Sequence, residues 1–381
     1  MKILPVEKIR EADTHTIANE PIQSIDLMER ASKKLAKWIT KRVDNTHVIR
    51  IFAGSGNNGG DGLALGRLLA EKNYLVEVYI IQGEGKFSPD CVTNLNRLQE
   101  IETARIHFLK ESKNFPAIDE DDIIIDALFG SGLSRPIKGI FAEIIGLINK
   151  SPAVKIVVDI PSGLFADSHS DEKAGAIVRA DYTLSFQMPK LAFMHPENDQ
   201  YVGRWQILDI GLSADYINKA ATKNFFIEKR DARLLIKPRA KFSHKGTFGH
   251  ALMVAGGEGK FGAAVLSAKA CLRSGVGLLH AHIPKSGSSI LQTTTPETML
   301  SIDKNESYFS EVPDLSAYSA VGVGPGIGME KQTQNALKLL IQNFQKPMVF
   351  DADALNILSE NKTWLSFLPK GSILTPHPKE F

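Results

Sequence analysis

Short apolar runs alternate with segments of helical spacing along the first half of the chain. Strands are predicted at residues 48–52, 75–81, 104–109, 122–126, 154–160, 181–186 and 205–210. Apolar residues at helical spacing predict helices at 26–40 and 139–149. Alternation of this kind indicates a mainly parallel sheet with helices on both faces.

The pattern changes between residues 211 and 240, where basic residues recur and Pro238 interrupts. A second alternation follows, with a predicted helix at 261–274 and predicted strands at 250–255, 278–283, 320–323, 347–350 and 372–375. We therefore expect two α/β domains, at residues 1–215 and 236–381, joined by a linker at 216–235.

Composition narrows the class of protein. The 381 residues are 43% hydrophobic and 23% charged, with a net charge of +2, which favours neither nucleic acid nor an acidic membrane surface as a partner. Cys91 and Cys271 have no metal-binding spacing, and a reducing cytoplasm is the simplest setting for them. The N-terminus lacks the apolar core of a secretory signal, and no run approaches the ~18 apolar residues of a membrane span.

Residues 53–62 are the most informative stretch, reading Ala-Gly-Ser-Gly-Asn-Asn-Gly-Gly-Asp-Gly. A predicted strand precedes them and a helical pattern follows them. Strand, glycine loop and helix together direct backbone N–H groups and a helix N-terminus at an anionic ligand. Glycine also lets the backbone approach a ligand closely. This stretch is therefore predicted to be a ligand-binding loop.

Two aspartates, Asp126 and Asp159, each end a predicted strand and precede a glycine turn. Alone, either could simply order a turn or cap a helix. The carboxyl ends of parallel strands share one edge of a sheet, so with the 53–62 loop they predict a common site. Its oxygen-bearing side chains suit a hard cation, and no His/Cys set is present to bind zinc. Arg135 could bind a phosphate through paired hydrogen bonds. We expect a phosphorylated or dinucleotide ligand, an oxygen-bound metal ion and one aspartate as general acid or base.

Four motifs occur in a distinctive order. They are Asn-Asn-Gly-Gly-Asp-Gly at 57–62, Asp-Ala-Leu-Phe-Gly-Ser-Gly-Leu at 126–133, Val-Asp-Ile-Pro-Ser-Gly at 158–163 and Ala-Asp-Tyr-Thr-Leu-Ser-Phe at 180–186. Together they resemble the NAD(P)H-hydrate epimerase domain over roughly residues 1–215. The resemblance implies a Rossmann-like three-layer αβα fold and an isomerase that interconverts the R and S hydrates of NADH and NADPH (NADHX and NADPHX).

The resemblance also implies roles for individual residues. Asp159 would transfer the proton, and K⁺ would be held by Asn58, Asp126 and Ser162. The hydrate substrate would contact Asp159 and a set of loop residues, namely Asn57, Asn58, Gly59, Gly60, Asp61, Gly130, Ser131, Gly132, Leu133, Ser134, Arg135 and Pro136. The family usually has Thr where Ser131 stands, which keeps a hydroxyl. A homo-oligomer is implied as well.

The second half resembles the ADP- or ATP-dependent NAD(P)H-hydrate dehydratase, a lyase with a ribokinase-like domain, over about residues 230–381. The motifs are His-Lys-Gly-Thr-Phe-Gly-His at 244–250, Val-Gly-Pro-Gly-Ile-Gly at 323–328, Phe-Asp-Ala-Asp-Ala-Leu-Asn at 350–356 and Thr-Pro-His-Pro-Lys-Glu at 375–380. The resemblance implies substrate contacts near Ala263, Gly326 and His377, with Mg²⁺ and ADP or ATP. The family's Gly-Thr-Gly-Asp loop with its catalytic Asp lies further downstream than Phe381, so we expect a partial domain without dehydratase turnover.

Other functions stay open. A non-catalytic nucleotide-binding or dimerisation module is the main alternative, and Asp126, Asp159 and the Asn-rich loop argue against it. A nicotinamide-dependent oxidoreductase is a second alternative, but no acidic residue clearly fits the ribose position that such enzymes use. A small-molecule kinase is a further alternative for the second half. The leading prediction is a bifunctional nicotinamide-hydrate repair enzyme.

Overall fold

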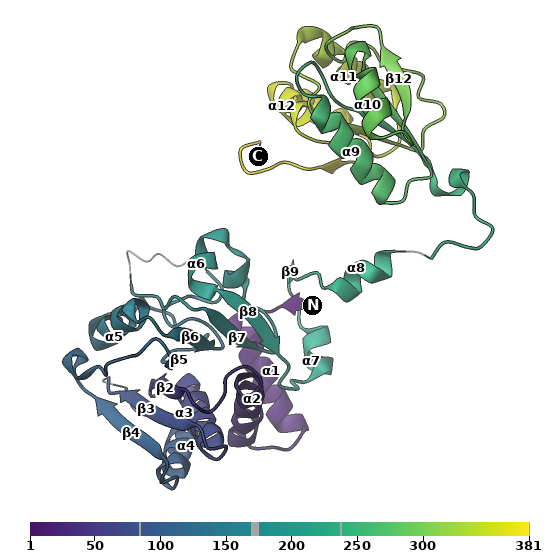
Figure 1. Cartoon of the computed structure of the whole chain (residues 1–381). Helices are drawn as coiled ribbons and strands as arrows, with labels where there is room; N and C mark the ends of the chain where they lie inside the picture. The colour runs from purple at the N-terminus through teal and green to yellow at the C-terminus, as the bar shows by residue number, and fades with distance from the viewer. Residues whose placement is uncertain (84, 169–174, 237, 381) are drawn as a thin grey trace. The chain divides into compact units, whose positions relative to one another are not determined.

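The computed structural model describes residues 1–83, 85–168, 175–236 and 238–380, so Phe381, the predicted last residue of the second domain, lies outside it. The chain divides into two compact units, residues 1–236 and 237–381. Each unit is built on its own parallel sheet (Figure 1). Within the described ranges, every helix is too short or too polar to cross a membrane.

The first unit has a seven-stranded sheet in which every neighbouring pair is parallel. In spatial order the strands are β4 (Ala104–Leu109), β3 (Leu75–Ile81), β2 (Val48–Ala53), β5 (Ile123–Ala127), β6 (Val154–Val158), β7 (Tyr182–Phe186) and β8 (Arg204–Leu208). The chain steps from β2 to β3 and β4 in one direction and continues from β5 in the other. The strand order therefore reverses between β2 and β5, which is where open α/β sheets bind ligands.

Apolar side chains cover both faces of this sheet. Ile49 and Ile51 of β2 pack on the side of α2 (Ser24–Ile39), α3 (Asn57–Ala70) and α4 (Pro89–Gln99). Phe52 packs on the opposite side, with α5 (Gly139–Lys150). Figure 1 shows these two helix layers. Burial on both faces explains why the strands read as continuous apolar runs, and it confirms the predicted fold class.

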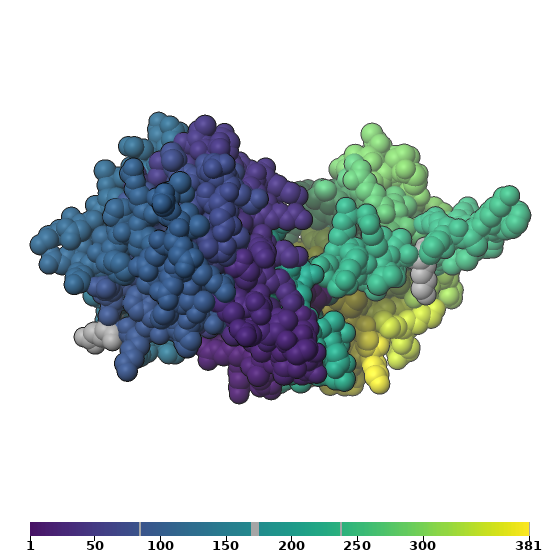
Figure 2. All heavy atoms as spheres, turned by 90° about the horizontal axis from the view of Figure 1, so that it is seen from below, coloured from purple at the N-terminus to yellow at the C-terminus, as the bar shows by residue number. Residues whose placement is uncertain are grey.

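The N-terminal segment joins the end of the first unit. Strand β1 (Lys2–Ile3) pairs antiparallel with β9 (Asn224–Phe225), and α1 (Val6–Asn19) follows β1. Figure 2 shows the N-terminal residues, in purple, at the surface of this unit. The segment predicted as a linker, 216–235, contains regular structure: the end of α7 (Ala214–Lys219), β9 and α8 (Lys229–Leu235). One further short helix, α6 (Asp199–Val202), precedes β8.

The second unit has a six-stranded parallel sheet. Its spatial order is β12 (Met299–Asp303), β11 (Leu278–Pro284), β10 (His250–Val254), β13 (Ala320–Val323), β14 (Met348–Phe350) and β15 (Ile373–Leu374). The helices are α9 (Phe261–Arg273), α10 (Ser288–Thr294), α11 (Lys331–Asn343) and α12 (Asp353–Glu360). Five of these strands were predicted from the apolar runs, whereas β12, only one of whose five residues is buried, was missed.

The structure corrects the predicted loop at 53–62. Helix α3 begins at Asn57, so residues 57–62 form its first turns rather than a loop. A Cβ on Gly59 would lie 1.9 Å from the carbonyl oxygen of Gly54, and one on Gly62 would lie 2.5 Å from the Cβ of Ala127. These glycines therefore let the helix approach the ends of β2 and β5 closely, which is a packing requirement that a loop interpretation misses.

Candidate active site

A cavity of about 780 Å³ opens at the carboxyl edge of the first sheet, beside the reversal in strand order. Its walls come from α1, the start of α3, the loop after β5 and residues that follow β6 and β7. The predicted contact residues that line it are Asn57, Asn58, Asp61, Gly130, Ser131, Gly132, Leu133, Ser134, Arg135 and Asp159. Gly59, Gly60 and Pro136 are not in its lining, and both of these glycines are buried within α3.

Asp126 is fully buried at the end of β5. Its Oδ1 accepts hydrogen bonds from the Leu128 N–H at 3.1 Å and the Ser162 hydroxyl at 2.6 Å, and its Oδ2 accepts one from the Ser162 N–H at 2.9 Å. Burial raises the pKa of Asp126 to about 6, although these hydrogen bonds oppose the rise. All three donors are neutral, so the carboxylate has no counter-ion among the described residues.

The residues around Asp126 are suited to a cation. Asn58 is buried beside this region, and its Nδ2 has no hydrogen-bond partner among the described residues. A Cβ on Gly130 would lie 3.2 Å from the Asn58 Oδ1, so the loop after β5 passes close to this amide. Ser162 also hydrogen-bonds the Phe129 N–H at 2.9 Å. One buried carboxylate with amide, hydroxyl and carbonyl oxygens nearby is a donor set that fits a hard cation.

Asp159 directly follows β6 and has a different environment. Its Oδ1 accepts hydrogen bonds from the Lys190 Nζ at 2.7 Å and the Phe186 N–H at 3.1 Å. Lys190 is only 2% exposed, and its Nζ also donates to the Ser185 hydroxyl at 3.0 Å. The backbone of Asp159 has φ +65°, which is uncommon for a residue other than glycine and costs about 1–3 kcal/mol. Backbone strain of this kind is typical of functional sites, where it orients a side chain toward the ligand.

Three of the charged residues in the cavity were not found from the sequence. They are Lys190, which follows β7, and Arg10 and Asp13 of α1. Burial and the nearby Asp159 raise the pKa of Asp13 to about 6. Burial raises the pKa of Asp61 well above its usual range, and Asp159, Asp13 and Asp90 add to the effect. The cavity therefore concentrates three carboxyl groups around one buried ammonium.

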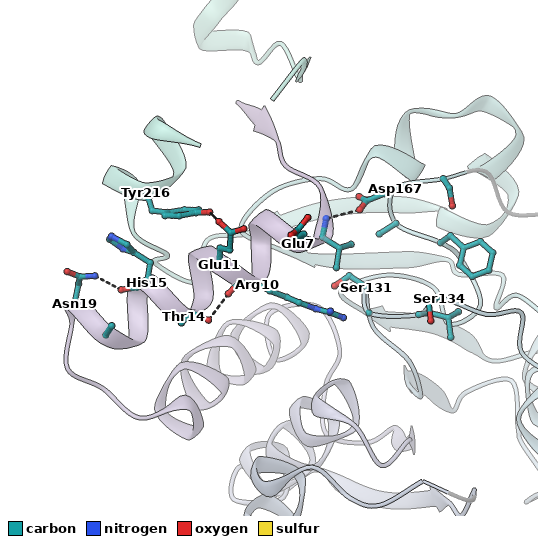
Figure 3. Close-up of a pocket in the computed structure, with 17 residues that line it drawn as sticks. Glu7, Arg10, Glu11, Thr14, His15, Asn19, Ser131, Ser134, Asp167 and Tyr216 are labelled. Atoms are coloured by element: carbon teal, nitrogen blue, oxygen red, sulfur yellow. Dashed lines mark hydrogen bonds between the residues drawn. The ribbon is translucent and has the colours of Figure 1, made fainter. Parts of the chain in front are cut away.

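A second hollow of about 900 Å³ lies along the neighbouring face of α1 (Figure 3). The two hollows share Arg10, Thr14 and residues 131–134, so they adjoin along this line. Figure 3 shows Arg10 reaching from α1 toward the loop that carries Ser131. Among the described residues, no carboxylate forms an ion pair with Arg10, which leaves its guanidinium available to an anionic ligand.

In the second unit, the loops after β10 and β13 meet at the carboxyl edge of the sheet, where its strand order also reverses. The Gly256 N–H donates to the Pro325 carbonyl at 2.7 Å. A Cβ on Gly326 would lie 3.3 Å from the Cβ of Ala263, so these two predicted contact residues are neighbours. His377 pairs instead with Glu380, with 3.2 Å between its Nε2 and the Glu380 Oε1. No hydrogen bond or ion pair among the described residues joins it to the other two.

Comparisons with known proteins bear on both units. Residues 24–192 match the family described as YjeF-related protein N-terminus, and residues 251–381 match the family described as NAD(P)H-hydrate dehydratase. The chain is 31% identical to a bifunctional NAD(P)H-hydrate repair enzyme of Moorella thermoacetica, over 100% of this chain and 74% of that protein. It is 30% identical to one of Coxiella burnetii, over 98% of this chain and 73% of that protein.

The crystal structure of the yeast protein YNL200c supports the fold of the first unit. It covers 61% of this chain and 98% of its own, with a TM-score of 0.50 and 21% identity. At that identity the similarity concerns the arrangement of the strands and helices alone.

Proposed function

Because the chain belongs to the family of bifunctional NAD(P)H-hydrate repair enzymes, we propose that its first unit interconverts the R and S hydrates of NADH and NADPH. One observation carries the proposal. The strained Asp159 and its buried partner Lys190 line a cavity at the reversal of strand order, together with residues at the start of α3. The adjoining hollow beside Arg10 is large enough to hold the part of a dinucleotide that extends beyond the reacting nicotinamide ring.

The reaction sets clear demands on the protein. The hydrate carries a hydroxyl on C6 of the nicotinamide ring, and inversion there requires that hydroxyl to leave and water to add to the other face. A positioned base that removes a proton from the incoming water lowers the barrier, typically by a factor of 10²–10⁴. Asp159 is our candidate for this base, because its carboxylate is already arranged as a hydrogen-bond acceptor at the cavity wall.

We also propose that Asn58, Asp126 and Ser162 hold K⁺. A bound cation would supply positive charge beside the buried Asp126 carboxylate, whose present partners are all neutral. The same residues fix the loop after β5, through the Phe129 N–H, and the start of α3, through Asn58. K⁺ would therefore order the cavity wall rather than take part in proton transfer.

For the second unit we propose a dehydratase-type domain that takes Mg²⁺ and ADP or ATP, with Ala263 and Gly326 near its substrate. The proposed domain bounds are 1–215 and 236–381, with 216–235 between them. The chain spans about three quarters of the length of the curated relatives cited above. A homo-oligomer and a cytoplasmic location stay predictions.

The deciding experiment is epimerisation of purified R-NADHX by the 381-residue protein, followed by chromatography, in K⁺ and then in Li⁺. We expect the S form to appear, and faster in K⁺. A folded protein that gives no conversion in either salt would favour the alternative of a binding or dimerisation module. Equal rates in both salts would remove the K⁺ proposal and leave the epimerase.

A further inference from the structure

Helix α1 presents one carboxyl group to the cavity from within an apolar stripe. Residues four apart lie on one face of a helix, and Ile9, Asp13 and Ile17 line the cavity together. A polar residue flanked in this way has no packing advantage over an apolar one. Among the described residues, none donates a hydrogen bond to the Asp13 carboxyl group or forms an ion pair with it, so α1 places a partly buried acid without a protein partner at the substrate cavity.

The surroundings of Asp13 favour its protonated form more than water does. Four charged groups act on it: Asp61 from α3, Asp159 from the end of β6, Lys190 from the segment after β7 and Arg10 from α1 itself. Burial and the negative Asp159 raise the pKa of Asp13 to about 6, and the two cations oppose the rise. At pH 7 about a tenth of the molecules therefore carry a proton on Asp13, whereas an ordinary aspartate carries almost none.

The environments of Asp13 and Asp159 differ in a way that suits one to an acid role and the other to a base role. Asp159 already accepts from the Lys190 ammonium at 2.7 Å, an arrangement that stabilises a carboxylate. Asp13 has no such donor. One cavity thus holds an acceptor with a fixed counter-ion and a second carboxyl group able to donate, which is a division of acid and base roles by environment.

We propose that Asp13 is the general acid of the epimerisation and Asp159 its general base, an inference that rests on the proposed function. The Asp13 proton passes to the C6 hydroxyl, and the C–O bond breaks with its electron pair going to oxygen. The lone pair of the ring nitrogen forms a double bond to C6, and water leaves. Water then adds to the opposite face of C6, the double bond returns its electrons to nitrogen, and the surplus proton goes to Asp159. Asp159 then releases its proton to solvent and Asp13 takes one up, which restores both groups.

The test is the Asp13→Asn variant, assayed for epimerisation of R-NADHX between pH 5 and 9. Wild-type kcat should fall as pH rises through about 6, because the protonated fraction of Asp13 falls. In Asp13→Asn, kcat should drop about 100-fold or more with KM little changed, and this limb of the profile should disappear. Asp13→Glu restores a carboxylic acid and should recover part of kcat together with the limb.

Stability separates this role from a structural one. Folding the wild type above pH 6 requires an ionised Asp13 to be partly buried, so Asp13→Asn should unfold at the same temperature or higher there. The exposed Asp215→Asn on α7 is the matched control and should keep wild-type kinetics. Loss of stability with a retained pH limb would overturn the proposal, as would a limb that disappears in Asp61→Asn and persists in Asp13→Asn. If the folded wild type gives no epimerisation, the proposed function fails instead.

Discussion

Asp126 and Asp159 end neighbouring strands of one sheet, and the sequence around each reads alike: an apolar run, an aspartate and a turn with glycine. Their surroundings nevertheless differ. Asp126 is fully buried among neutral donors. Asp159 is 8% exposed at the cavity and is paired with the Lys190 ammonium at 2.7 Å.

This difference separates two ways of keeping a buried carboxylate charged. A carboxylate that has only neutral partners needs a cation from solution, so its region can respond to salt composition. A carboxylate with an internal ammonium is independent of the salt and is available for proton transfer, provided that its strained backbone holds it in place. In the proposed function, the same sequence pattern serves a metal-ion role at one strand end and a catalytic role at the next.

The largest effect is expected at the Asp159 side. Asp159→Asn should lower epimerisation on the order of 10³-fold, since the amide cannot accept the proton from water. It should also lower the free energy of unfolding by about 3 kcal/mol, because Lys190 is left as a buried charge without a counter-ion. Turnover is measured by chromatography of the two hydrates and stability by urea unfolding.

The double variant Asp159→Asn with Lys190→Met is the control for that result. Removing both charges should restore most of the lost stability while leaving turnover low. Recovery of turnover together with stability would mean that Asp159 supports the fold and does no chemistry.

A smaller effect, in a different observable, is expected at the Asp126 side. Asp126→Asn should raise the K⁺ concentration for half-maximal activity at least tenfold, because the only charge in the proposed donor set is removed. Its kcat at saturating K⁺ should change much less than that of Asp159→Asn. Lys190→Met is the matched control, since it should lower kcat and leave the K⁺ requirement alone. An unchanged K⁺ titration in Asp126→Asn would break the comparison.

The positions of both aspartates were predictable because each depends only on where a parallel strand ends. Their partners were not. Lys190 lies 31 residues beyond Asp159 and follows β7, so no local spacing links the two. The +65° φ of Asp159 could not be anticipated, since glycine is the usual residue there. Asp13 could have been noticed in the sequence, because it is an acidic residue at helical spacing between Ile9 and Ile17. That spacing marks the residue as unusual but does not reveal the cavity that it lines.

Two serines allow the finest test of the comparison. The Ser162 hydroxyl donates to Asp126 at 2.6 Å, while the Ser185 hydroxyl accepts from Lys190 at 3.0 Å beside Asp159. Because one hydrogen bond contributes about 0.5–1.5 kcal/mol, Ser162→Ala should raise the K⁺ requirement about threefold and Ser185→Ala should lower kcat about threefold. If Ser185→Ala changed the K⁺ requirement as well, Asp126 and Asp159 would act as one coupled network, and the separation of a salt-dependent region from a catalytic one would be wrong.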